Sequence, residues 1–168
     1  MEPISEEIVE RTWREVACFS PDRAEREMEK IGRSQPELLA FMVGGTEDMG
    51  REVRELGLYM FFVIFRMFQS VLGRIGRISS EDIIECYEHN EALIERLVGA
   101  HEKILERVVR FQISKQPHVL KYVVEALMEE EKGDSFTLTE EEKGFLFLLL
   151  KTVVDVLDRK ARESPHRI

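Results

Sequence analysis

One long and mostly apolar stretch, Leu56–Leu72, limits what this chain can fold into. A membrane-spanning helix needs about 20 apolar residues with few charges. This stretch has 17 residues and contains Arg66, Gln69 and Ser70, and a charge near the middle of a span costs about 2.5–3.5 kcal/mol. We therefore expect no membrane span here but a central helix buried on nearly all sides. The alternative is that the bundle covers one side of this helix and a second subunit covers the other.

The rest of the chain is patterned for helices. Apolar residues recur at helical spacing, and no run of β-branched residues alternates strictly as in a strand. Signals such as Ser20-Pro21, the Ser34…Glu37 pattern and the Thr139…Glu142 capping box divide the chain into segments. The sequence predicts an all-α fold, a compact bundle of five to seven helices in a single domain, 1–168, with 1–45 as a candidate N-terminal subdomain. The predicted helices cover about 5–18, 21–31, 35–43, 46–72 or 46–75, 80–114, 117–131 and 139–162.

The long helix predicted at 80–114 carries a heptad-like seam, in which apolar residues recur at alternating spacings of four and three. Two polar residues, Asn90 and His101, lie in this seam, and Glu91 lies in a parallel row beside it. A polar residue in such a seam can fix the register or the oligomeric state. The plainer interpretation is a core histidine satisfied by one hydrogen bond, and a third is a ligand or pH-sensitive group. The seam comprises Ile83, Tyr87, Asn90, Ile94, Leu97, His101, Ile104, Val108 and Phe111.

Arg66 interrupts the apolar stretch and needs an explanation. A guanidinium inside a buried helix requires an acidic partner, such as Glu91 or another carboxylate. The simpler alternative is that Arg66 extends to the surface beside Gln69 and Ser70. A small apolar ligand between helices, in a pocket near Tyr59, Arg66, Tyr87 and His101, is a further hypothesis.

One cluster has the side chains of a metal site. Glu85, Cys86 and His89 lie within one turn of the predicted long helix, at spacings that could share a metal. The Glu-x-x-His pattern of di-iron bundles is absent, however, and so is the HExxH of zinc proteases. We therefore expect no metal or cofactor, with this cluster as the weak alternative to a solvated charged face.

Composition indicates which partners, which cellular compartment and which growth temperature to expect. The net charge is −9, and no third of the chain is basic, so the surface that would release counterions from nucleic acid is missing. Two lone cysteines, Cys18 and Cys86, and an acidic N-terminus without an apolar core favour a cytoplasmic protein. Glutamate occurs 27 times, arginine 16 times and asparagine once, which is typical of thermophiles but also of any helix-rich chain.

The sequence contains no catalytic motif: neither a nucleophile elbow, nor a phosphate-binding loop, nor a dinucleotide fingerprint. We therefore predict a non-enzymatic helical domain for protein interaction or scaffolding, which forms a homodimer through the seam or through Phe145–Leu150 of the last helix. The binding of a small apolar ligand is the alternative, and an enzyme is the third choice.

Overall fold

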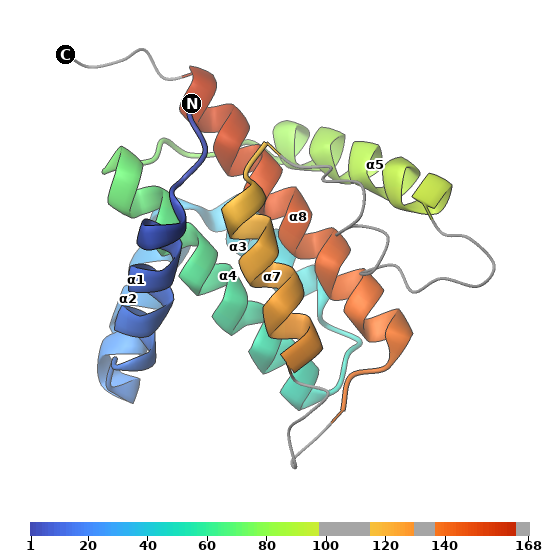
Figure 1. Cartoon of the computed structure of the whole chain (residues 1–168), viewed down its shortest axis with the longest axis horizontal. Coiled ribbons are helices and arrows are strands. Elements are labelled where there is room, and N and C mark those ends of the chain that lie inside the picture. The colour runs from blue at the N-terminus through green and yellow to red at the C-terminus, as the bar shows by residue number, and fades with distance from the viewer. Residues whose placement is uncertain (98–114, 130–136, 164–168) are drawn as a thin grey trace.

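The computed structural model describes residues 1–97, 115–129 and 137–163, and within them all regular structure is helical (Figure 1). This confirms the predicted all-α bundle. The helices are α1 (Glu6–Ala17), α2 (Pro21–Ser34), α3 (Pro36–Gly45), α4 (Arg51–Leu72), α5 (Ser80–Leu97), α7 (Pro117–Glu129) and α8 (Glu140–Glu163). The second half of the predicted 80–114 helix, with His101 and Gly99, lies outside the described residues.

Local hydrogen bonds set the beginnings of most helices. The Ser5 hydroxyl accepts from the Ile8 amide at 3.2 Å, and the Ser20 hydroxyl accepts from the Arg23 amide at the same distance. At α8 the Glu142 amide donates to the Thr139 hydroxyl at 3.1 Å, and the Thr139 amide donates to the Glu142 carboxylate at 2.9 Å. This reciprocal pair is the capping box expected from the sequence.

The beginning of α3 differs from the prediction. Ser34 ends α2, and its hydroxyl donates back to the Ile31 carbonyl at 3.3 Å. Gln35 is the N-cap of α3, because Pro36 occupies the first helical position, and it makes no side-chain cap bond. Its amide instead binds the segment between α4 and α5, accepting from the Ile78 amide at 3.0 Å and donating to the Gly76 carbonyl at 2.8 Å.

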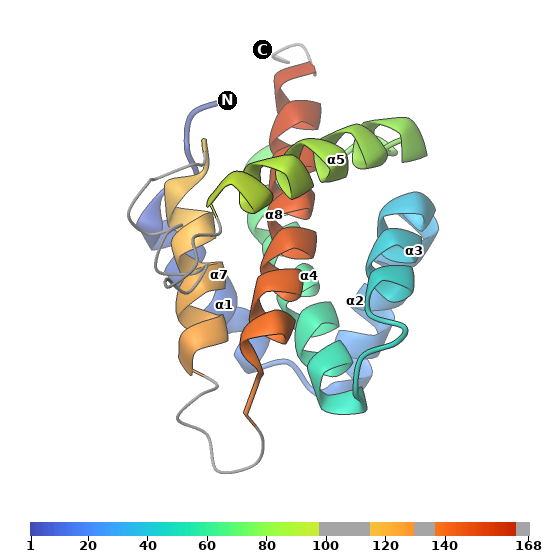
Figure 2. The ribbon, with the colours of Figure 1, turned by 90° about the vertical axis from the view of Figure 1, so that its right-hand side faces the viewer.

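Helices α4 and α8 form the centre of the bundle. In Figure 2, α1 and α7 lie on one side of this pair, α2 and α3 lie on the other, and α5 crosses over α8. Side chains Met60–Phe65, Met67 and Phe68 are buried, which confirms the predicted central apolar helix. Gly57 permits the close approach of α8, since a Cβ at this position would lie 2.9 Å from the Leu146 Cδ2 atom.

The N-terminal helices pack against the later ones. Helix α1 packs against α4 and α7, and α3 packs against α4, α5 and α8. Buried apolar side chains of α1, α3, α4, α7 and α8 form one continuous cluster.

Among the described residues, α4 alone is long and apolar enough to cross a membrane. Its most apolar window has a mean hydropathy of 1.4, and half of that window is buried against the rest of the chain. The central helix of a bundle has the same length and composition.

Candidate functional site

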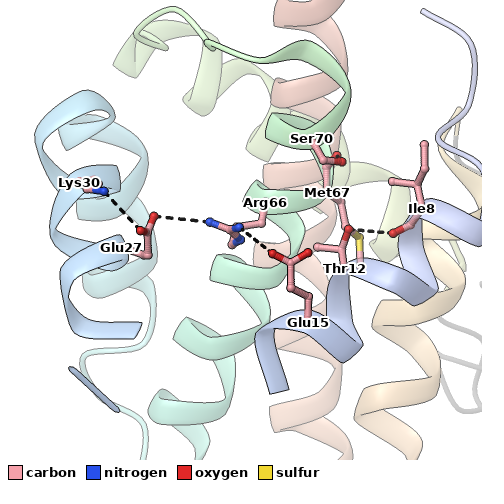
Figure 3. A network of polar contacts seen from close by, with 8 residues as sticks. All are labelled: Ile8, Thr12, Glu15, Glu27, Lys30, Arg66, Met67 and Ser70. Atoms are coloured by element: carbon pink, nitrogen blue, oxygen red, sulfur yellow. Dashed lines mark hydrogen bonds and ion pairs between the residues drawn. The ribbon is translucent and has the colours of Figure 1, made fainter. Parts of the chain in front are cut away.

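Arg66 joins three helices (Figure 3). Its Nη2 atom lies 3.3 Å from the Glu15 carboxylate of α1, and its Nη1 atom lies 3.5 Å from the Glu27 carboxylate of α2. The guanidinium also stands over the Phe19 ring, 5.0 Å from its centroid. The side chain is 20% exposed, so it reaches the edge of α4 and is paired there with Glu15 and Glu27, not with Glu91.

The other residues of the predicted apolar pocket lie against different elements. Tyr87 packs edge-on against Phe41 of α3, with 5.8 Å between ring centroids, and burial together with the nearby Glu91 carboxylate raises its phenol pKa. Tyr59 lies beside Tyr122 of α7. The described residues of this set, Tyr59, Arg66 and Tyr87, are therefore not gathered in one cavity, and His101 lies outside the described residues.

Asn90 is fully buried and is satisfied within the chain. Its Nδ2 atom donates to the Asp155 carboxylate at 2.9 Å and to the Thr152 hydroxyl at 3.3 Å. Its Oδ1 atom accepts from the Lys151 ammonium at 2.8 Å. The only asparagine of the chain therefore fixes α5 against α8.

Lys151 is the residue of this network that sequence reasoning missed. Its side chain is only 3% exposed, and the ammonium lies 2.7 Å from the Asp155 carboxylate. Burial of an ammonium requires such a partner, because a lone charge there would be very costly. The available signal was a lysine directly after the apolar run Phe145–Leu150 with an aspartate four residues later.

A cleft of about 540 Å³ opens beside this network, between α5 and α8. Its lining is almost entirely polar or charged: Glu85, Cys86, His89, Lys115, Lys151, Asp155, Asp158, Arg159 and Arg162. We call it the α5/α8 cleft. The three residues of the weak metal alternative, Glu85, Cys86 and His89, thus line one cleft.

These three residues share the cleft but are not arranged around a common point. No group of three or more His, Cys, Asp or Glu side chains in the described part of the chain is arranged to hold a metal ion. The Glu85 carboxylate instead pairs with the Arg159 guanidinium at 3.4 Å. Burial raises the pKa of the Cys86 thiol, while a hydrogen bond with Arg159 opposes that shift. A thiol with a raised pKa is a weak nucleophile and a weak metal ligand at neutral pH.

A second buried network includes Asp158, which also lines the cleft. The Asp158 carboxylate accepts from the Gln116 amide at 2.8 Å and from the Arg162 Nε at 2.7 Å. Gln116 in turn accepts from the Ile4 amide at 2.8 Å. The N-terminal segment, the beginning of α7 and the end of α8 are thereby joined through Asp158.

A different surface carries exposed aromatic side chains. A hollow of about 210 Å³ between α1 and α7 is lined by Trp13, Val9 and Tyr122, with a charged rim. Trp13 is 39% exposed, and Tyr59, beside Tyr122, is 43% exposed. Burial raises the phenol pKa of Tyr122 strongly. Met128 of α7 is also exposed. It follows Lys121 and Glu125, which line the hollow, at helical spacing, so it lies on the same side of α7. We call Trp13, Tyr59, Tyr122 and Met128 the Trp13 face.

Of the two surfaces first expected to join two subunits, the described parts lie largely inside the chain, and the seam positions His101, Ile104, Val108 and Phe111 lie outside the described residues. In the seam of α5, Ile83 and Asn90 are buried, and Phe147, Leu149 and Leu150 of α8 are buried as well. Helices α4, α5 and α7 cover α8, so these residues have no need of a second subunit.

Comparison with known proteins identifies no relative. No protein-family model, no curated protein and no solved structure matches the chain.

Proposed function

We propose that this protein is a non-enzymatic helical interaction domain that forms a homodimer through its Trp13 face. The observation that carries the proposal is the exposed Trp13 of α1, which lines one hollow with Tyr122 of α7, while Tyr59 of α4 beside Tyr122 is exposed as well. Tryptophan and tyrosine are the residues that most often dominate the energy of protein interfaces. Exposing them without a partner leaves apolar surface in water.

The charges around this face favour a second copy as the partner. A two-fold symmetric contact places the same surface opposite itself, so the surface must carry both charge signs to avoid repulsion. The rim of the hollow holds Glu6, Glu10 and Glu125 as well as Lys121. Lys121 pairs with Glu6 and Glu125 within the chain, which offsets part of the acidic charge that two copies would bring together.

Composition supports the remaining parts of the proposal. The acidic charge balance opposes binding to nucleic acid, and the lone cysteines suit a reducing cytoplasm. Half of the most apolar stretch of α4 is buried against the rest of the chain, which favours a core helix over a membrane span. The abundance of glutamate and arginine supports adaptation to high temperature.

The test is the molar mass of the purified chain over a range of concentrations, measured by size exclusion with light scattering. We expect a mass twice the 19.7 kDa of the monomer, and a monomer for Trp13→Glu. The matched control is Ile84→Glu, which places the same charge on an exposed apolar residue of α5 and should leave the dimer intact. Because Trp13 is the only tryptophan, its fluorescence should also shift to shorter wavelength as the dimer forms.

Two results would contradict the proposal. One is a monomeric mass at every concentration. The other is a dimer that Trp13→Glu leaves unchanged, since the contact would then lie elsewhere on the molecule.

A further inference from the structure

The α5/α8 cleft differs in charge from the rest of the molecule. The chain has 33 acidic and 24 basic side chains, but the cleft is lined by four cations and three carboxylates. The cations are Lys115, Lys151, Arg159 and Arg162. A cleft that reverses the sign of the whole chain favours an anion.

Each carboxylate of the cleft already has a cation of its own. Asp155 pairs with Lys151 at 2.7 Å, and Asp158 pairs with Arg162 at the same distance. Glu85 pairs with Arg159 at 3.4 Å. Lys115 forms no ion pair with any described residue, so the cleft lining carries a net positive charge.

The cleft also has hydrogen-bond donors that no described residue accepts from. The buried Lys151 ammonium has three N–H bonds, and its acceptors are the Asn90 amide and the Asp155 carboxylate. Arg162 donates its Nε–H to Asp158, and its two terminal nitrogens have no acceptor among the described residues. Lysine and arginine donors of this kind are the usual ligands of phosphate groups.

We propose that the α5/α8 cleft binds the phosphate group of a small hydroxylated molecule. Lys115, Lys151 and Arg162 hold the phosphate, which carries more negative charge and more acceptor oxygens than a carboxylate. The volume of about 540 Å³ is that of a small-molecule site and far exceeds a single phosphate ion. The carboxylates Glu85 and Asp155 accept hydrogen bonds from hydroxyl groups on the remainder of the ligand.

The test follows backbone amide signals by NMR while the full chain is titrated with glycerol phosphate, inorganic phosphate or glycerol. We expect glycerol phosphate to shift signals of residues that line the cleft and to bind more tightly than inorganic phosphate. Glycerol alone should leave the spectrum unchanged. Lys115→Gln should weaken the binding of glycerol phosphate about fivefold, because it removes one charged donor.

The matched control is Lys30→Gln, which removes an exposed lysine of α2 and should leave the affinity unchanged. Trp13→Glu should also leave it unchanged, so the result does not depend on the dimer. Absence of binding at millimolar concentration would overturn the proposal, and so would equal weakening by both lysine variants. Inorganic phosphate binding as tightly as glycerol phosphate would mean an adventitious ion only and would overturn it as well.

Discussion

Buried polar residues position helices of this bundle against one another. Lys151 and Asn90 lie inside the contact between α5 and α8, and every buried side-chain nitrogen and oxygen in the described residues has a hydrogen-bond partner. Apolar packing alone tolerates several registers, whereas a buried ammonium tolerates only the register that brings it to a carboxylate. The contact of α5 with α8 is therefore set by a few polar atoms within a mostly apolar surface.

We predict that Asp155→Asn lowers the free energy of unfolding by about 3 kcal/mol, since Lys151 then stays buried without its counterion. Replacing Lys151 by Met in the same variant should restore part of that loss. Urea denaturation measures both changes. The control is Glu55→Gln, which breaks the exposed pair with Arg51 and should cost at most about 0.5 kcal/mol. A loss for Asp155→Asn no larger than the control would disprove the role given to this pair.

At the scale of elements, side chains at the ends and edges of helices hold their neighbours in place. Arg66 at the edge of α4 binds α1 and α2 through Glu15 and Glu27. Gln35, between α2 and α3, binds three backbone groups of the segment that leads into α5. Since Gln35 is fully buried, water cannot replace these bonds.

We predict that Gln35→Ala lowers the free energy of unfolding by about 2 kcal/mol, because the buried amide of Ile78 loses its acceptor. Amide hydrogen exchange should show a larger loss of protection at Ile78 than in the middle of α4. Gln69→Ala, on the exposed side of α4, is the control and should change neither quantity. Unchanged relative exchange at Ile78 would show that Gln35 does not hold this segment.

At the scale of the whole molecule, two helices lie at the centre and five described helices surround them. The outer surface is rich in charged residues, which form pairs within helices, such as Arg14 with Glu10, and between helices, such as Lys121 with Glu6. Single exposed pairs contribute little to the free energy of unfolding at room temperature, but networks of such pairs contribute more as the temperature rises.

We predict a thermal unfolding midpoint above about 65 °C, the upper end of the range for mesophilic domains. Differential scanning calorimetry measures it. Molar salt should lower the midpoint, because salt screens exposed charges. A midpoint inside the mesophilic range, or one that molar salt leaves unchanged, would contradict thermal adaptation through surface charges.

The sequence by itself determined the helical class, the capped beginnings of helices such as α1, α2 and α8, and the burial of most of Met60–Phe68 in the predicted central helix. These features depend on residues within a few positions of each other, so spacing along the chain is enough to predict them. The tertiary structure alone decided that Arg66 pairs with Glu15 and Glu27, which lie 51 and 39 residues away. It also decided that Lys151 and Asn90 meet beside the α5/α8 cleft. Such contacts depend on how helices cross, and that follows from the packing of the whole core.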